Sequence, residues 1–539
     1  MSKILKGTMI LTGATFLSKF LGMIYTVPFE QMVGPEGMEL YFYAYTPYNI
    51  LLSLSTLGVP MAVSKFVSKY NSLEDYQTGR DMFKAGMQLM GITGIITFLI
   101  LFLSAEPIAQ FSLSNEDTNA SLEDTAMVIR MVAFALLIIP SMSIIRGFFQ
   151  GNESMAPTGI SQVIEQIVRI IFLLVSVYLV LYVFEGSIPT AIGYSTFAAF
   201  IGGIASLLVL IVFWKKRKPY LDRQLENQEY SYDLSKKSMF KELISYAGPF
   251  VLVGIATPLY QLIDQFTFNK AMATAGLGSI SGASLSAIHV LSHKLVIIPV
   301  TLGIGLSLAL LPAITKSFTK NNMNQLNHQI NQALQIVALL IIPAVTGLAV
   351  LAYEAYGSFY GVENVDYYGS LLRWYAPVGL LFATYTVSAA ILQGINRQNF
   401  ALVSLGAGLF IKLVTNSLFI ISFGAKGSII STGLAVLVAL SLNLWRINRG
   451  IRFSYKPVFK RTLLILILTA IMTFTVWIVK FGFGLVWNPL DDRLASLFIL
   501  MISAGLGGLL YLWMAYQTTL LERILGGRVR VLDKFLKRR

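Results

Sequence analysis

The sequence contains no cysteine, and only 13% of its 539 residues are charged. The absence of cysteine excludes disulfides, thiolate metal sites and cysteine nucleophiles. A soluble domain carries about 25% charged residues, so the low charge and the 55% hydrophobic content exclude a soluble enzyme, a disordered chain and a coiled coil. The sequence also lacks a P-loop motif, and we expect no cleavable signal peptide. These absences predict a protein whose apolar surface is covered by lipid.

Long apolar segments recur along the chain. A helix needs roughly 20 apolar residues to cross the hydrocarbon core, and in lipid its backbone polar groups must be satisfied internally. The alternation of β-barrel strands is missing. We therefore predict an all-α polytopic membrane protein with fourteen transmembrane helices, at 8–33, 39–63, 85–104, 125–149, 158–184, 190–214, 246–268, 287–314, 330–353, 371–395, 400–423, 429–447, 462–480 and 495–516.

The basic residues, which give the chain a net charge of +14, follow a topological pattern. With the N-terminus in the cytoplasm, the outward connections hold only Lys270, Lys426, Lys480 and Arg493, and most of the 41 lysines and arginines lie on the cytoplasmic side. This asymmetry predicts a multi-pass protein of the cell membrane with both termini cytoplasmic. We therefore attribute the positive charge to topology and expect no nucleic-acid partner.

The first half of the chain is echoed in the second. Phe-Gln-Gly at 149–151 corresponds to Leu-Gln-Gly at 392–394, and the same offset places Arg169 on Lys412. Such parallel repeats frame a central substrate path. We predict two six-helix lobes in a pseudo-twofold arrangement, with the chain divided into an N-terminal lobe (1–214), a cytoplasmic linker (215–245), a C-terminal lobe (246–448), a helix pair (462–516) and a basic amphipathic tail (517–539).

Two lysines stand inside predicted helices without an acidic residue three or four positions away. Lys19 lies about eleven residues into the first span, roughly 16 Å deep at 1.5 Å per residue. Lys294 lies in the eighth span, close to His289 and His293. Because an ionisable group at this depth costs several kcal/mol, we interpret both lysines as contacts for water or an anionic ligand.

Other charged side chains within the spans have competing explanations. Glu165 and Arg169, four residues apart, either neutralise each other or contact substrate. Arg146 is nearer a helix end, which favours a side chain that reaches toward the membrane surface. His289 and His293 have a spacing suited to a metal but no evident third ligand, so we expect neither a metal nor a cofactor.

Two stretches resemble a known family. Residues 17–22 read Leu-Ser-Lys-Phe-Leu-Gly, and the eighth span runs from Lys294 through Pro299 to Leu-Leu-Pro-Ala-Ile-Thr-Lys-Ser-Phe at 310–318. These resemble the "S-R-x-L-G" and "R-x-x-x-x-P … L-L-P-x-L-S-K-S-F" stretches of the lipid II flippases, the MurJ family of the multidrug/oligosaccharidyl-lipid/polysaccharide exporter superfamily. The chain as a whole is similar to the Gram-positive branch and its related sporulation proteins.

The resemblance implies a transporter, not an enzyme. Such a protein carries the undecaprenyl diphosphate-linked peptidoglycan precursor from the inner to the outer leaflet by alternating access. It also implies a cationic cavity for the diphosphate and a groove for the polyprenyl tail in the last two helices. Lys19 and Lys294 take the places of two family arginines, whereas Tyr25 and Leu52 stand where Gram-negative members have further arginines. The implied substrate-binding residues are Lys19, Lys294, His293, Arg146, Arg169 and Glu165.

A second set of polar residues falls where some family members bind sodium. In this sequence, the corresponding spans offer Asp264, Lys412 and Asn416. Our hypothesis is that the Lys412 ammonium replaces the cation by pairing with Asp264. As partners we expect a lipid-linked anionic substrate and membrane lipids; cell-wall synthesis machinery is a candidate partner, and we expect a monomer.

Three other functions stay open at this point. The first is export of another lipid-linked oligosaccharide, such as a teichoic acid or capsule precursor, which the sequence does not separate from lipid II. The second is a multidrug/cation antiporter of the same superfamily, for which acidic residues in the cavity would be expected. The third is a membrane glycosyltransferase, which the outward loops disfavour because they lack clustered His, Asp and Arg residues.

Overall fold

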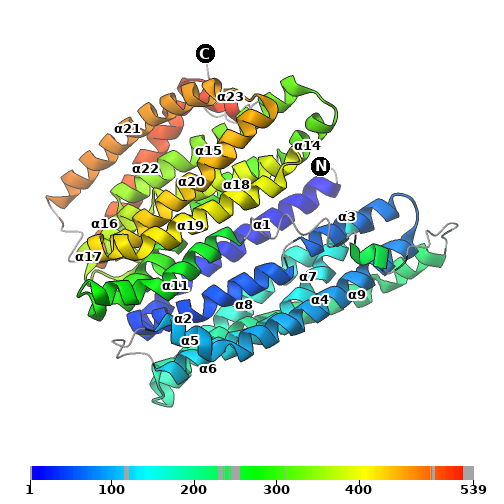
Figure 1. Cartoon of the computed structure of the whole chain (residues 1–539), viewed down its shortest axis with the longest axis horizontal. Helices are drawn as coiled ribbons and strands as arrows, with labels where there is room; N and C mark the ends of the chain where they lie inside the picture. The colour runs from blue at the N-terminus through cyan, green and yellow to red at the C-terminus, as the bar shows by residue number, and fades with distance from the viewer. Residues whose placement is uncertain are drawn as a thin grey trace. The chain divides into compact units, whose positions relative to one another are not determined.

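The computed structural model describes residues 3–56, 58–113, 121–226, 228, 235, 237–241, 243, 255–308, 310–485, 487 and 492–525. Every regular element in these ranges is a helix (Figure 1). Packing divides the chain into two units. Unit 1 is Met1–Ala273 with Gly278–Ala283, and unit 2 is Thr274–Leu277 with Ser284–Arg539.

Unit 1 is built from long helices joined by short turns. Asp75 and Ser121 cap two of them, because their side chains accept hydrogen bonds from the backbone N–H groups of Thr78 and Asp124. The helices are α1 (Lys3–Ile24), α2 (Thr26–Thr56), α3 (Val59–Asn71), α4 (Tyr76–Leu103), α5 (Ala105–Ser112), α6 (Leu122–Ala133), α7 (Ala135–Gly151), α8 (Ala156–Tyr178), a π-helical turn at Leu179–Val183, α9 (Ile188–Glu226), α11 (Ala256–Thr274) and a 3₁₀ turn at Gly278–Ile280.

Helix α2 is interrupted at Gly34, where φ is 64° and ψ is −175°. This backbone conformation favours glycine, and the following Pro35 has no N–H to continue the helical hydrogen bonds. The break falls between the predicted first span, which ends at residue 33, and the predicted second span, which begins at residue 39. Helix α1 and the first turns of α2 therefore correspond to the first span.

The core of unit 1 includes a cluster on α3, α4 and α7 that contains Val63, Met82 and Ile144. Helix α7 approaches α3 closely at Gly147, where a Cβ atom would meet the Pro60 carbonyl oxygen at 2.4 Å. Helix α9 continues to Glu226, so the first part of the predicted linker (215–245) is helical. An ion pair of 2.6 Å between Arg80 and Asp222 joins this extension to α4.

Unit 2 repeats this pattern of long apolar helices. Helix α12 (Ser281–Ser286) crosses the division between the units. The remaining helices are a π-helical stretch η3 (Ala287–Ser292), α13 (His293–Leu308), α14 (Leu311–Thr319), α15 (Met323–Val350), α16 (Ala352–Tyr360), α17 (Val365–Tyr375), α18 (Val378–Gly394), α19 (Gln398–Phe423), α20 (Ala425–Ile451), α21 (Lys456–Gly484), α22 (Arg493–Gln517) and α23 (Leu520–Leu525).

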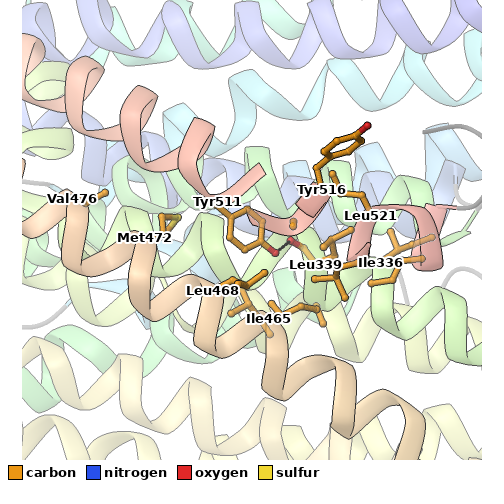
Figure 2. Packing of buried hydrophobic residues seen from close by; sticks show 14 of the residues in the cluster. Ile336, Leu339, Ile465, Leu468, Met472, Val476, Tyr511, Tyr516 and Leu521 are labelled. Carbon is orange, nitrogen blue, oxygen red and sulfur yellow. Dashed lines mark hydrogen bonds between the residues drawn. The ribbon is translucent and has the colours of Figure 1, made fainter. Parts of the chain in front are cut away.

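The last two long helices pack on α15 of the same unit through a buried apolar cluster (Figure 2). Leu339 of α15, Leu468 and Met472 of α21, and Tyr511 of α22 belong to this cluster. The Tyr511 hydroxyl donates to the Leu339 carbonyl oxygen at 2.8 Å, so the one polar group of this ring is satisfied. Helices α21 and α22 are therefore held to α15.

The described residues contain twelve helices that are long and apolar enough to cross a membrane. One of them, Thr26–Asn71, combines α2 with α3, and Gly13–Ile24 is a shorter apolar helix. The prediction of an all-α polytopic membrane protein is confirmed. The predicted seventh span is described from residue 255 onward, and the tail beyond Leu525 lies outside the described residues.

Candidate functional site

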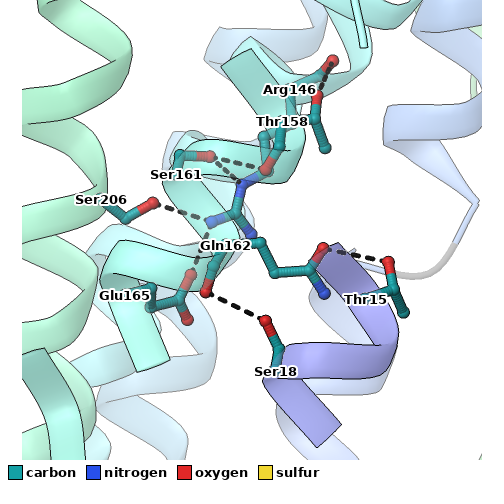
Figure 3. Close-up of polar contacts among 8 residues, drawn as sticks. All are labelled: Thr15, Ser18, Arg146, Thr158, Ser161, Gln162, Glu165 and Ser206. Carbon is teal, nitrogen blue, oxygen red and sulfur yellow. Dashed lines mark hydrogen bonds and ion pairs between the residues drawn. The ribbon is translucent and has the colours of Figure 1, made fainter. Parts of the chain in front are cut away.

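Lys19 of α1 has an exposed side chain and forms no hydrogen bond or ion pair with another residue in the described part of the chain. Its helix is held to α8 by two polar contacts in the turn that precedes Lys19. The Thr15 hydroxyl donates to the Gln162 side-chain oxygen at 3.2 Å, and the Ser18 hydroxyl reaches the Gln162 carbonyl oxygen at 3.4 Å (Figure 3). The ammonium group therefore sits on a helix whose position is fixed, while its own donors are available.

Arg146 of α7 lies at the centre of a polar network in unit 1 (Figure 3). Its Nη2 is 2.6 Å from Glu165 Oε2 and 2.8 Å from the Ser206 hydroxyl, and its Nε donates to the Ser161 hydroxyl at 3.0 Å. The side chains of Arg146 and Glu165 are 16% and 19% exposed. The network joins α7, α8 and α9.

Two interpretations of these charges are wrong: the pairing of Glu165 with Arg169, which was one of two alternatives, and the reach of Arg146 toward the membrane surface. Glu165 pairs with Arg146 of the neighbouring helix, and Arg169 on its own helix donates elsewhere. Arg146 points into the unit and does not reach toward the membrane surface, since its donors meet Ser161, Glu165 and Ser206. The reason is tertiary packing: α7 and α9 bring an arginine and a serine to the face of α8 that carries Glu165. Sequence spacing alone considers only partners on one helix.

Arg169 is bound by aromatic side chains. Its Nη2 donates to the Tyr45 hydroxyl at 2.6 Å, and its guanidinium lies 5.4 Å from the centre of the Tyr45 ring. The rings of Tyr41 and Tyr45 stack at 4.1 Å, and the hydroxyls of Tyr25 and Tyr41 are 3.0 Å apart. Tyr25, which replaces a family arginine, thus belongs to a tyrosine row that ends at Arg169. The Arg169 Nε is buried without a hydrogen-bond partner among the described residues.

His293 and Lys294 begin α13, directly after the π-helical stretch η3. The His293 Nδ1 is 2.8 Å from the Tyr375 hydroxyl of α17. Lys294 is half-buried, and His289 is 6% exposed. π-helical turns are rare and frequently mark functional sites. In unit 2, the predicted histidine and lysine are therefore adjacent on a helix of unusual geometry.

Lys412 is fully buried in unit 2, with 0% exposure. Its ammonium donates to the Thr432 hydroxyl at 2.6 Å and to the Ser428 carbonyl oxygen at 3.1 Å, both on α20. Asn416, one turn further along α19, is also fully buried. Asp264 is fully buried on α11 of unit 1.

Unit 1 also contains a buried polar cluster that was not predicted from the sequence. The Asn269 amide donates to Glu39 Oε1 at 3.2 Å, and the Gln265 amide donates to the Ser112 hydroxyl at 2.8 Å and to the Tyr43 carbonyl oxygen at 3.1 Å. The available signal was Glu39, an acid at the start of a predicted span. Gln162 was missed because an uncharged residue attracts little notice in an apolar segment.

The arrangement of long apolar helices in two units is that of known membrane transporters. A lipid II flippase MurJ in an inward closed conformation matches with a TM-score of 0.66 at 16% identity, covering 96% of this chain and 99% of that chain. An inward-facing multidrug resistance MATE family transporter of the MOP superfamily matches with a TM-score of 0.62 at 16% identity, covering 81% and 94%. The chain therefore shares the fold of these transporters.

Sequence similarity narrows this class. Residues 4–318 match the family described as polysaccharide biosynthesis protein. The chain is 48% identical to the lipid II flippase MurJ of Bacillus subtilis (strain 168) over 98% of both chains, and 26% identical to stage V sporulation protein B of the same organism over 81% of both. The chain belongs to the lipid II flippase (MurJ) family, so the predicted resemblance is confirmed. It is a transporter and not an enzyme, and the antiporter and glycosyltransferase alternatives are not favoured.

Proposed function

We propose that this protein flips an undecaprenyl diphosphate-linked peptidoglycan precursor from the inner to the outer leaflet by alternating access. The observation that carries the proposal is the 48% identity to a lipid II flippase over 98% of the chain. No covalent bond changes during transport. An inside-negative membrane potential favours the step, because moving one negative charge outward is worth about 2.3 kcal/mol per 100 mV.

The proposed substrate contacts are cationic groups in both units. Lys19 supports this role because its ammonium is exposed and has no partner among the described residues. Lys294 and His293 contribute from the start of α13. A lysine binds phosphate as a point charge, without the two-pronged geometry of arginine. Arg169 of unit 1 is a further proposed contact, because its Nε is buried without a hydrogen-bond partner among the described residues.

Arg146 and Glu165 serve the same site by positioning it. Their ion pair fixes α8 against α7, and Gln162 on α8 binds the turn of α1 that precedes Lys19. Loss of this pair would shift the helix that holds α1. We therefore assign contact with the diphosphate to Lys19 and support of its helix to Arg146 and Glu165.

The finer topology belongs to the same proposal. We propose fourteen membrane helices with both termini in the cytoplasm, two six-helix lobes (1–214 and 246–448) and a tail groove formed by the helices of 462–516. The break at Gly34 supports counting α1 with the first turns of α2 as one span and the rest of α2 as the next. We also propose that the protein acts as a monomer among membrane lipids and meets the cell-wall synthesis machinery, which would use the flipped precursor.

For ion coupling, we propose that the Lys412 ammonium takes the place of a bound cation, with Asp264 and Asn416 as its partners in the transport cycle. The burial of all three side chains supports this role. Replacing Lys412 by alanine should then create a dependence of transport on sodium. Unchanged ion dependence together with unchanged transport would contradict the proposal.

The function is tested by depleting the protein in cells and measuring lipid II exposed on the outer face. Depletion should lower this exposure, and it should be restored by the unaltered protein. Lys19→Ala should fail to restore it at equal protein level, and Lys19→Arg should restore most of it because the cation is kept. As a matched control, Lys426→Ala removes a basic residue from the start of α20 and should behave like the unaltered protein. Normal lipid II exposure after depletion would reject this substrate and favour another lipid-linked oligosaccharide.

A further inference from the structure

A groove of about 630 Å³ opens on unit 2 between α15, α16, α17 and α21. Its lining extends along α21 from Leu466 to Lys480, a rise of about 21 Å at 1.5 Å per residue. Half of a 30 Å hydrocarbon core is about 15 Å, so the groove is long enough for one acyl chain of a leaflet. Among the described residues its lining includes none from α22, whereas Val476 of α21 packs against Gly507 of α22.

One end of the groove is cationic. Arg373 is exposed there and forms no hydrogen bond or ion pair with another residue that the structure describes. Lys480 lies at the same end, 2.8 Å from Glu354 Oε1, and its charge is offset by this buried carboxylate. The groove therefore carries one uncompensated positive charge, from Arg373. Trp477, which is 54% exposed, stands one turn below Lys480 and has the amphipathic ring typical of the membrane interface.

The wall of the groove carries two unsatisfied hydroxyls. A threonine in a helix commonly donates to the carbonyl four residues earlier, as Thr475 does to Ile471 at 3.1 Å. Thr469 and Thr473 line the groove one turn apart, and neither buried hydroxyl has a hydrogen-bond partner among the described residues. Thr469 is only 3% exposed. Because buried polar groups are normally hydrogen-bonded, these two donors indicate a ligand that carries acceptor oxygens into an otherwise apolar groove.

We propose that this groove binds an anionic phospholipid of the surrounding membrane. Its phosphate contacts Arg373, its ester oxygens accept hydrogen bonds from the threonine hydroxyls, and an acyl chain lies along α21 toward Leu466. The groups of the groove follow the order of groups along such a lipid. Arg373 corresponds to the phosphate, Trp477 to the headgroup region, and the threonine hydroxyls to the ester oxygens. With the topology proposed above, the site faces the outer leaflet. The site is distinct from the proposed tail groove between α21 and α22, and its assignment to the outer leaflet rests on the topology of the proposed function.

The test uses the full chain in vesicles that contain phospholipids brominated on the acyl chains, which quench nearby tryptophans. The quenching that is due to Trp477 is obtained as the difference in quenching between the unaltered protein and Trp477→Phe. Brominated phosphatidylglycerol should quench this contribution at about a fivefold to tenfold lower mole fraction than brominated phosphatidylcholine. Arg373→Ala should reduce this preference to less than twofold, whereas the matched control Lys426→Ala should keep it.

The hydroxyls are tested by a second pair of variants. Thr473→Val should raise the mole fraction of phosphatidylglycerol needed for half-maximal quenching by about threefold, and Thr475→Val should leave it unchanged. Equal quenching by the two lipids, or a preference that survives Arg373→Ala, would overturn the proposal. Displacement of phosphatidylglycerol by an equimolar polyprenyl diphosphate lipid would also overturn it, because the groove would then belong to the transported substrate. None of these readouts requires flipping activity.

Discussion

Replacing Arg146 by methionine removes the cation of a buried ion pair and keeps the volume of its stem. Breaking such a pair costs 3–5 kcal/mol when the partner stays charged. Since the side chains of Arg146 and Glu165 keep 16% and 19% exposure, we expect the lower value, about 3 kcal/mol. Unfolding entropy near 2.1 cal/mol/K per residue gives about 0.6 kcal/mol/K for a unit of roughly 280 residues. The melting temperature should therefore fall by about 5 °C.

A double-mutant cycle separates the interaction energy of the Arg146–Glu165 ion pair from the effects of the two single substitutions. Glu165→Gln should cost about 1.5 kcal/mol, or about 3 °C, because Arg146 keeps its serine partners. Combining both changes removes both charges, so the double variant should lose about 3 °C instead of the summed 8 °C. The assay is thermal unfolding in detergent followed by intrinsic tryptophan fluorescence, since a chain without cysteine offers no site for thiol-reactive dyes.

An exposed ion pair in the same unit provides the control. Arg130 and Glu106 are also 2.6 Å apart, but their side chains are 37% and 62% exposed. Pairs of this kind contribute about 1 kcal/mol or less, so Arg130→Met should lower the melting temperature by less than about 2 °C. Additive effects at Arg146 and Glu165, within about 1 °C, would refute the reasoning and leave Arg146 free to contact substrate.

Two further predictions concern helix packing and topology. Gly202→Ala should lower the free energy of unfolding by more than about 2 kcal/mol, because the added Cβ would meet the Glu165 carbonyl oxygen at 2.8 Å. At the adjacent Gly203 the nearest atom is 3.5 Å away, so Gly203→Ala should be nearly neutral in the same unfolding assay. A cysteine replacing Glu185 should react with an impermeant maleimide in intact cells, and one replacing Lys218 should react only after permeabilisation. The opposite labelling pattern would invert the proposed topology.

The membrane class and the helix positions could be predicted because they depend on local properties. Apolar length alone locates a membrane helix, and Gly34 followed by Pro35 marks the end of one. The direction in which the side chains of each helix point is harder to predict from the sequence. Nothing in the sequence signals the π-helical turns at Leu179–Val183 and Ala287–Ser292, since an apolar run does not distinguish a π-helical turn from an α-helical one.

The charged residues of the site could be found from the sequence, but their partners could not. Lys19 was predicted because a cation stands out in an apolar segment. The pairing of Glu165 with Arg146 requires knowing that α7 and α8 place these residues side by side. The same limit hid Tyr45, whose hydroxyl binds Arg169 across 124 positions of sequence. A tyrosine in a membrane helix attracts no attention until its neighbour is known.

The π-helical stretch at Ala287–Ser292 sets the direction in which the side chains of α13 point. A wide turn holds about one residue more than an α-helical turn, and each residue of an α-helix advances the side chains by about 100°. Deleting one residue from this stretch would allow a regular α-helix to form. It would rotate the Lys294 side chain about the helix axis by nearly a third of a turn and leave the helix length almost unchanged. The orientation of the Lys294 side chain thus depends on the one extra residue of the π-helical stretch. A variant that lacks this residue would keep the positive charge and change only its direction.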